Sequence, residues 1–454
     1  MKTRILLAIL LIAGLWLQGC KKYLDVKSDD KLVVPHTLDD VQALLDDATI
    51  MNIRTTPSFG EAMADDYFWL PATYSARPES DQKLYQWIPQ EMNYGNDWSQ
   101  AYRAIYNTNL SLELLDQIPV TTANQSQWNN AKGSALFFRS YYFLLLLGQY
   151  GFAYDEQTSD KDLGIVLRTG SDFNVPSVRA TVHDCYEQIN NDLKTSLSYL
   201  PDYPQHVMRP SKGAAYALLS RSYLYMRQYS ETLKYAGEAL KLNSTLMDYN
   251  NDASIISLTA AVPFRKYNQE IIFYAEMGTF TAFHITARAK IDSTLYASYA
   301  TNDLRRTCFF KANSGYQQFK GSYAANANNF FTGLATDEQY LNRAEANAYL
   351  GNTSDAMIDL NYLMKKRWKN TITYSAITAT DREDALKKVR TERRKELLMR
   401  NLRWMDVKRW NKEGAGIIMR RNINGKIVEL LPGAAFYALP LPTDIVNLTG
   451  LQQN

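Results

Sequence analysis

The chain has 454 residues, of which 46% are hydrophobic and 21% are charged, and its formal net charge at pH 7 is +3. A chain of this length can bury a large core, arranged either as about three domains or as one repeat fold. Its nearly balanced charge excludes the strongly basic surface typical of nucleic-acid-binding proteins. Besides Cys20, the only cysteines are Cys185 and Cys308. Because two thiols are too few for a disulfide framework or a zinc site, we expect core residues or one disulfide.

The first 20 residues have the pattern of an export signal that ends in a cysteine. A basic start precedes an apolar run over 5–17, and the segment closes on Cys20. This run is long enough for a secretory signal, whereas a membrane-spanning helix needs about 20 residues. The segment resembles a bacterial lipoprotein signal, although an ordinary signal with a chance cysteine is the alternative. We therefore expect removal of 1–19, lipidation of Cys20 and a polar tether over 20–36, since several acyl chains anchor a protein firmly.

Amphipathic helices with capping residues are predicted along most of the remaining chain. Thr37, Asp97 and Thr181 each precede apolar residues at helical spacing. Their side-chain oxygens can accept hydrogen bonds from the free amides of a first turn. The longest apolar stretch lies over 131–149, where Gly148 and Gly151 end the pattern. The sequence therefore predicts a mostly α-helical protein.

Two segments, 211–243 and 337–368, resemble tetratricopeptide helix pairs. Each has small and aromatic residues at spacings close to the unit of about 34 residues, with a short turn between its two helices. At least about three repeats are needed to bury a continuous face. The helices that begin near Trp98 and Ala131 are candidates for a third pair.

Irregular segments separate these predicted helices. A β-rich run covers 268–274, and 421–430 contains Asn-Gly between apolar residues, which predicts a hairpin. Residues 314–336 are rich in glycine, alanine, asparagine and aromatic residues, so we expect a loop there. Long loops within a compact domain are uncommon unless they are functional. We therefore expect the ligand-binding insertions around 50–97 and 250–335.

An ordered series of motifs resembles the SusD/RagB family of outer-membrane nutrient-binding lipoproteins. The resemblance covers nearly the whole chain, and it depends on the joint order of the motifs, not on any one of them. The motifs are CKKYLDV at 20–26, ALFFRSYYF at 135–143, RPSKGAA at 209–215, DEQYLNRAEA at 337–346, ERRKEL at 392–397, RWMDVKRW at 403–410 and LPLP at 439–442.

The resemblance implies about four tetratricopeptide-like helix pairs in a single SusD-like domain over 37–454, with long irregular insertions and a few short β-hairpins. It also implies a lipid anchor in the outer membrane, facing the exterior, and a partner, a SusC-like TonB-dependent transporter that receives a captured oligosaccharide. In one departure from the family, lysines 21 and 22 follow the cysteine directly. Sorting to the cell surface therefore depends on the resemblance alone.

The stretch from Asp65 to Trp98 is the predicted ligand-facing segment. It holds 8 aromatic residues in 34, about double the 12% of the whole chain. Aromatic faces complement the C–H groups of a sugar ring, while amide and guanidinium groups pair with its hydroxyls. Alternatively, several of these rings pack the loop onto the helices, and Trp98 is in phase with its own helix. The candidate ligand-binding residues are Tyr67, Trp69, Tyr74, Arg77, Trp87, Asn93, Tyr94 and Asn96.

A second group of aromatic residues lies within the predicted loop at 314–336. It could form the opposite wall of a cleft, although packing explains it equally well. The group consists of Tyr316, Phe319, Tyr323, Phe330 and Phe331.

Other patterns are better explained without catalysis. The adjacent acids Asp65 and Asp66 do not define the carboxylate spacing of about 5–9.5 Å that glycosidases use, so solvated loop acids are expected there. The alternative is that they accept hydrogen bonds from sugar hydroxyls. The basic run from Arg390 to Arg409 is interleaved with acidic and apolar residues, which predicts a salt-bridged packing element. The sequence shows no metal-ligand, nucleotide or nucleophile motif. We expect a binding protein that is not an enzyme and has no cofactor.

Three functions remain at this point. The first is capture of a glycan for the transporter. The second is capture of a peptide, as in a minority branch of the same family. The third is a tetratricopeptide scaffold without a ligand, or a surface hydrolase. The sequence does not specify the linkage or chain length of a glycan.

Overall fold

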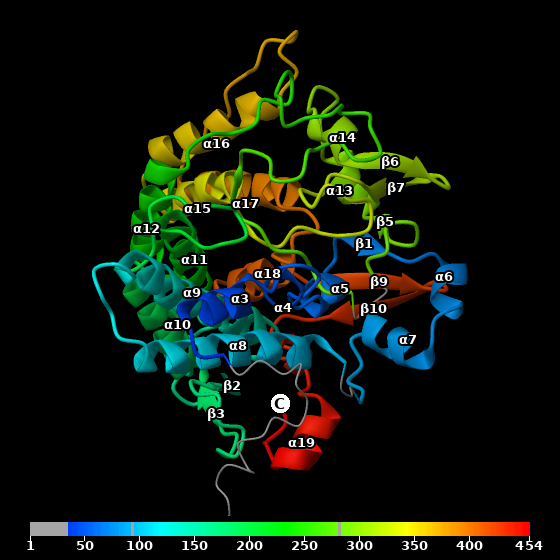
Figure 1. The fold of residues 1–454 in the computed structure, drawn as a ribbon. Helices are drawn as coiled ribbons and strands as arrows, with labels where there is room; N and C mark the ends of the chain where they lie inside the picture. Colours follow the sequence, from blue (N-terminus) through cyan, green and yellow to red (C-terminus); the bar gives the residue numbers. More distant parts are fainter. Residues whose placement is uncertain (1–34, 92–94, 280–282) are drawn as a thin grey trace, which may run out of the picture.

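The computed structural model describes residues 35–91, 95–279 and 283–454, and helices dominate them (Figure 1). The predicted signal peptide and Cys20 lie outside these residues. The helices are α3 (Leu38–Asp46), α4 (Ala48–Met51), α5 (Phe59–Met63), α6 (Pro71–Ser75), α7 (Glu79–Tyr85), α8 (Asp97–Gln117), α9 (Gln125–Tyr150), α10 (Val182–Ser196), α11 (Lys212–Tyr225), α12 (Tyr229–Leu242), α13 (Ser293–Ala297), α14 (Arg305–Cys308), α15 (Thr336–Tyr349), α16 (Thr353–Arg367), α17 (Arg382–Glu396), α18 (Arg403–Lys412), α19 (Thr443–Thr449) and the 3-10 helix Ala435–Tyr437.

Within the described chain, the strands pair as two-stranded antiparallel sheets: β1 with β5, β2 with β3, β4 with β8, β6 with β7, and β9 with β10. The strands are β1 (Tyr67–Phe68), β2 (Leu163–Val166), β3 (Arg179–Thr181), β4 (Ile271–Phe273), β5 (Lys290–Ile291), β6 (Phe310–Asn313), β7 (Tyr316–Phe319), β8 (Leu334–Ala335), β9 (Met419–Ile423) and β10 (Lys426–Leu430).

The longer helices stack side by side and form the frame of the molecule. Helix α9 packs between α8 and α10, α11 packs on α12, and α15 connects α12 to α16 and α17. Figure 1 shows this helix stack on the left, while α6, α7 and the hairpin of β6 and β7 lie on the right. The fold is therefore mostly helical with tetratricopeptide-like pairs, as predicted.

Both predicted helix pairs are present at the expected residues. The hydroxyl group of Ser211 accepts a hydrogen bond from the Ala214 amide and caps α11, and α12 follows after a short turn. In the second pair, Gly351 has a φ of +87° between α15 and α16. Only glycine adopts this left-handed conformation without a steric cost, so this residue allows the sharp reversal of the chain.

Two of the three predicted helix caps are confirmed, and the third is shifted by one residue. Thr37 and Thr181 cap α3 and α10. Helix α8 is capped by Asn96 instead of Asp97. The Asp97 carboxylate accepts hydrogen bonds from the backbone and hydroxyl of Ser58, which belongs to the loop before α5. Burial raises the pKa of Asp97 to about 6, so this acid serves tertiary packing.

The predicted hairpin is confirmed, whereas the loop predicted at 314–336 is partly wrong. Asn424 and Gly425 connect β9 and β10 with φ angles of 53° and 87°, as a type I′ turn requires. Within the predicted loop, however, β7 pairs with β6 through a turn at Ser314 and Gly315, whose φ angles are 54° and 83°. This serine-glycine turn is a second two-residue hairpin, which the polar composition of the segment concealed.

Buried ion pairs connect the helix stack to the second insertion. The Arg367 guanidinium lies 2.7 Å from the carboxylate of Glu396 and 2.8 Å from that of Glu270, and Arg305 lies 2.9 Å from Glu396. All four side chains are fully buried. Arg367 ends α16, Glu396 ends α17, and the other two residues belong to the insertion. The pairs therefore fix the insertion against the stack.

The two described cysteines are core residues. Cys185 and Cys308 are both buried free thiols, so the alternative of one disulfide is wrong. Burial raises the pKa of Cys185 to about 12, which keeps the thiol protonated and unreactive at neutral pH.

Candidate functional site

The two predicted insertions meet at a short sheet. Strand β1 pairs with β5, which places Phe68 opposite Lys290 and Tyr67 opposite Ile291. The amide of Asp292 also donates a hydrogen bond to the Asp66 carbonyl, 2.9 Å away. The right-hand side of Figure 1 shows β1 beside β5, close to α6, α7 and β7. Residues that are far apart in the sequence therefore build one surface.

Strand β1 determines which aromatic side chains point inward. Successive side chains of a strand lie on opposite sides. Tyr67 and Trp69 are accordingly 2% exposed, while Phe68 between them is only partly buried. The ring of Trp69 stacks on Tyr85 with centroids 4.4 Å apart, and its Nε1 donates to the Phe283 carbonyl at 2.9 Å. The Phe283 ring also contacts the indole, with centroids 4.7 Å apart, so Trp69 is enclosed by protein in the described structure.

Two further candidates are also packed inside. Trp87 is 6% exposed, its Nε1 donates to the Met63 carbonyl at 2.9 Å, and the Arg421 guanidinium lies 4.6 Å from its ring centroid. Asn96 is used as the cap of α8, where its side chain accepts from the Ser99 amide. Asn93 and Tyr94 lie outside the described residues. For the packed rings, the alternative that they hold the insertion onto the body describes the structure best.

Tyr74 and Arg77 remain on the surface. The hydroxyl group of Tyr74 accepts a hydrogen bond from Gln86 Nε2 at 2.7 Å, which orients the ring. The Nε atom of Arg77 is buried without a hydrogen-bond partner among the described residues, and the charge of Arg77 acts on Asp81. Burial raises the pKa of Asp81, while Arg77 and Arg288 oppose that shift. The two terminal nitrogens of Arg77 make no hydrogen bond among the described residues either, so they are the donors that a ligand could reach.

The second aromatic group contributes one surface ring. Tyr316 is 37% exposed and contacts Phe68 edge to face, with centroids 5.3 Å apart. The other four members are buried packing residues: Phe319, Tyr323, Phe330 and Phe331. Sequence reasoning did not select Phe68, although its place between two inward-facing rings of a strand is a signal that could have identified it. Phe68 contacts Tyr316, and both Arg77 and Arg288 lie near Asp81. We call these five residues together with Tyr74 the insertion face.

The adjacent acids in this segment belong to partly buried ion pairs. Asp65 lies 2.7 Å from Arg403, and Asp66 lies 3.0 Å from Arg394. Burial alone would raise the pKa of Asp65, but Arg403 and Arg394 hold it below its usual range. The prediction of solvated loop acids is therefore wrong. The sequence concealed these pairs because both arginines belong to the basic run near the C-terminus.

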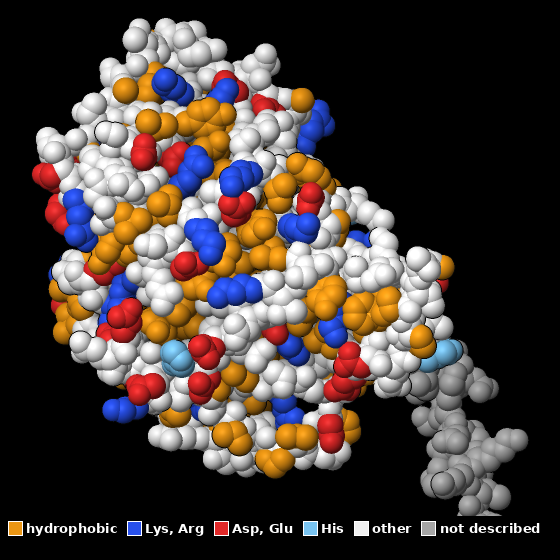
Figure 2. Space-filling model, turned by 90° about the vertical axis from the view of Figure 1, so that its left-hand side faces the viewer, with side chains coloured by type: hydrophobic (Ala, Val, Ile, Leu, Met, Phe, Trp, Pro, Cys, Tyr) orange, Lys and Arg blue, Asp and Glu red, His pale blue; other side chains and the backbone are white. Residues whose placement is uncertain are grey.

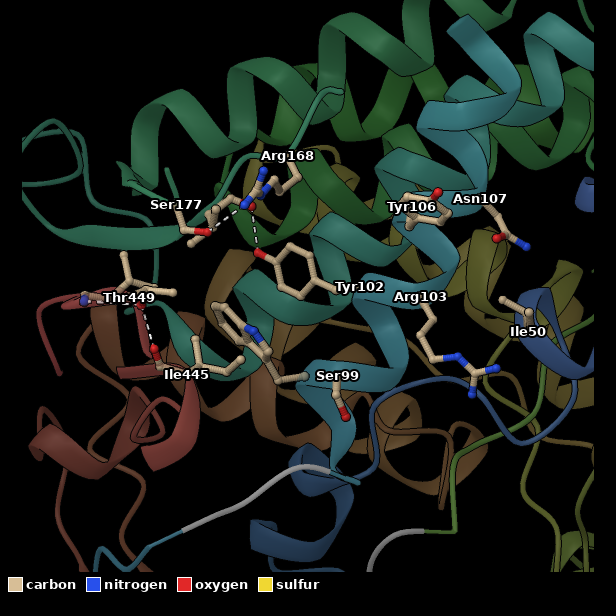
Figure 3. Close-up of a pocket in the computed structure, with 13 residues that line it drawn as sticks. Ile50, Ser99, Tyr102, Arg103, Tyr106, Asn107, Arg168, Ser177, Ile445 and Thr449 are labelled. Carbon is tan, nitrogen blue, oxygen red and sulfur yellow. Dashed lines mark hydrogen bonds between the residues drawn. The ribbon is translucent and has the colours of Figure 1, made fainter. Parts of the chain in front are cut away.

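A separate pocket of about 410 Å³ lies between α8 and α19 (Figure 3). Its wall is largely apolar and includes Trp98 and Ile445. Two of its polar groups are engaged within the protein, since the Tyr102 hydroxyl donates to the Val166 carbonyl at 2.6 Å and Arg168 donates to Ser177 at 3.0 Å. This pocket therefore offers few free groups for a polyhydroxylated ligand.

Comparisons with known proteins agree with this architecture. The family described as "Starch-binding associating with outer membrane" matches residues 22–224, and the SusD family matches residues 317–438. No curated protein matches the chain. Among solved structures, a putative sugar binding protein from Bacteroides vulgatus superposes with a TM-score of 0.76 at 22% identity, covering 93% of this chain and 99% of its own.

Two other solved structures have the same fold. A SusD superfamily protein from Bacteroides thetaiotaomicron gives a TM-score of 0.72 at 20% identity, covering 92% of this chain and 99% of its own. A laminarin binding SusD-like protein gives a TM-score of 0.65 at 18% identity, covering 91% of this chain and 97% of its own. Together with the two family matches, the helix stack identifies this chain as a member of the SusD/RagB family.

Proposed function

We propose that this protein is a cell-surface lipoprotein that binds oligosaccharides and delivers them to a SusC-like TonB-dependent transporter in the outer membrane. Family membership supports the ligand class, since one similar protein is described as laminarin binding and another as a putative sugar binding protein. The mature chain begins at Cys20, a tether extends over 20–36, and a single SusD-like domain covers 37–454. Among the described helices, none has the length and apolar character needed to cross a membrane.

The observation that carries this proposal is the meeting of two insertions at the insertion face. Phe68, Tyr74 and Tyr316 supply aromatic surface there, and the terminal nitrogens of the partly exposed Arg77 supply donors. A sugar needs this combination, because its ring faces are apolar and its rim is polar. Helix α6 and the β6–β7 hairpin position these residues on a rigid frame. The face is built for capture, and the protein carries out no reaction on its ligand.

Calorimetric titration with maltoheptaose and laminarihexaose tests the proposal. We expect Tyr74→Ala and Tyr316→Ala each to weaken binding by about 0.5–1.5 kcal/mol, the usual contribution of an aromatic contact. Arg77→Ala should cost about 1.5–3 kcal/mol if its guanidinium holds a ligand oxygen. The control is Tyr362→Ala, which removes a tyrosine of similar exposure, 45%, from α16.

Unchanged affinity in the three insertion-face variants would show that the site lies elsewhere. Binding of peptides but not of either oligosaccharide would instead favour the peptide-binding branch of the family. Release of shorter products from starch or laminarin by the purified protein would contradict the non-catalytic assignment.

A further inference from the structure

A second, polar groove lies on the helix-stack side of the molecule. It has a volume of about 1000 Å³ and is bounded by α3, the loop before α9, the first residues of α9 and the segment 199–209. Figure 1 shows α3, α9 and α10 on the left, whereas α6 and α7 lie on the right. The groove is therefore well separated from the insertion face.

Side-chain bonds hold the walls of this groove in place. Gln127 Nε2 of α9 donates to Asp39 of α3 at 2.8 Å. Arg209, beyond α10, donates through Nε to the Asp46 carboxylate at the end of α3 at 2.9 Å. The start of α9 and the segment 199–209 are thus both tied to α3, and a ligand would meet a preformed surface, which lowers the entropic cost of binding.

Several groups that line the groove have no partner in the protein. The side chains of Gln125, Asn129 and Tyr203 make no hydrogen bond among the described residues, and Tyr203 is 60% exposed. Nε2 of Gln42 is buried without a partner. Tyr199 also lines the groove. Amides and phenols both donate and accept, as sugar hydroxyls do.

Tyr199 is held in a fixed orientation. Its ring contacts Trp128 edge to face with centroids 6.0 Å apart, and Trp128 Nε1 donates to the Leu115 carbonyl at 3.2 Å. An oriented aromatic ring is a suitable stacking surface for the apolar face of a sugar.

The charge of the groove selects a neutral ligand. Its lining includes one acid, Asp39, and one base, Arg209, and each is already bonded within the protein. Figure 2 shows the left-hand side of the molecule, where acidic and basic side chains are intermingled without a broad patch of one sign. Nucleic acids and polyanionic glycans therefore have no electrostatic attraction to this region.

We propose that this polar groove is a second glycan-binding site, which takes a neutral oligosaccharide segment. The inference rests on the proposed function for its ligand class. It adds the location of a second binding site and a role for that site. Two sites on one rigid body can hold one long polysaccharide at two points, which raises the effective concentration at each. The groove retains the polymer while the insertion face binds the segment to be transported.

The test separates the two sites by mutation. We compare the wild type, the insertion-face variant Tyr74→Ala/Tyr316→Ala, the groove variant Asn129→Ala/Tyr203→Ala, and a variant with all four changes. Titration uses maltoheptaose and laminarihexaose, and hydrogen–deuterium exchange with each sugar locates protected peptides. Tyr362→Ala is the control, and circular dichroism checks that every variant is folded.

In the insertion-face variant, we expect the remaining binding to protect peptides from 119–130 and 199–209. Adding the groove substitutions should then weaken that binding about fivefold to tenfold. If the groove variant binds like the wild type and those peptides stay unprotected, while the insertion-face variant loses binding, the groove proposal alone is overturned. If neither variant loses binding, or if the wild type binds neither sugar, both proposals are overturned. If only the groove variant loses oligosaccharide binding, the groove is supported as a binding site and the insertion face is contradicted as one.

Discussion

Replacing Trp69 by alanine distinguishes a core role from a ligand-binding role. A tryptophan side chain buries roughly 150–250 Å², and about 25 cal/mol is gained per Å². Because Trp69 is only 2% exposed, Trp69→Ala removes nearly all of this contribution, which is about 4–6 kcal/mol. The bond from Nε1 to the Phe283 carbonyl adds about 1 kcal/mol. We therefore expect Trp69→Ala to lower the free energy of unfolding by at least about 4 kcal/mol.

Urea unfolding followed by far-ultraviolet circular dichroism measures this change. The midpoint should fall while the slope with urea concentration stays constant, since the unfolded state exposes the same surface. Trp69→Phe keeps most of the ring and removes the Nε1 bond, so it should cost only about 1–2 kcal/mol. Tyr74→Ala should cost less than Trp69→Ala, because Tyr74 is only partly buried.

The reasoning fails if Trp69→Ala unfolds within about 1 kcal/mol of the wild type but no longer binds any oligosaccharide. That result would show that the indole faces a ligand in solution, as the sequence first suggested. Loss of stability with normal binding by the folded fraction would confirm the packing role.

Three other measurements test the buried charges and thiols. Arg221→Met leaves the buried carboxylate of Glu338 unpaired, so it should lower the free energy of unfolding by about 3–5 kcal/mol. Arg343 is partly exposed, so Arg343→Met should change that free energy by about 1 kcal/mol or less. Equal losses in the two variants would contradict the argument. Burial lowers the pKa of Lys408 to about 7, so the folded state binds fewer protons than the unfolded state above that pH. The Lys408 contribution should therefore make urea stability rise from about pH 7 towards pH 10, and Lys408→Met should flatten this rise; an unchanged slope would show that other groups cause it. Cys185 and Cys308 should react with a thiol reagent only after unfolding, and rapid native labelling would disprove their burial.

Local sequence patterns predicted the helix stack well, because the helices carry their own apolar periodicity and several of them, such as α3, α10 and α11, are capped by a side chain. The helix caps at Thr37 and Ser211 and the turn at Gly351 can each be recognised from a few neighbouring residues. The candidate site was predicted less completely. Whether Trp69 or Phe68 faces outward depends on the pairing of β1 with β5, a contact that no local pattern reveals.

The same limit applies to charged residues. Asp65 follows ordinary loop signals, and its partner Arg403 lies in a distant basic run. Spacing in the sequence does not show which distant charges will be buried together. Composition correctly identified the aromatic enrichment of the first insertion, but not which rings would remain accessible.

The pairing of β1 with β5 also determines how much of the chain must be synthesised before the insertion face can form. Ribosomes synthesise a chain from its N-terminus, so Tyr67–Phe68 is made long before Lys290–Ile291. A fragment that stops after α12 would contain several of the stacked helices, but it would lack Arg288 and Tyr316 of the insertion face. The insertion face is therefore complete only after Tyr316 has been made, whereas the residues that line the polar groove all lie in the N-terminal half of the chain.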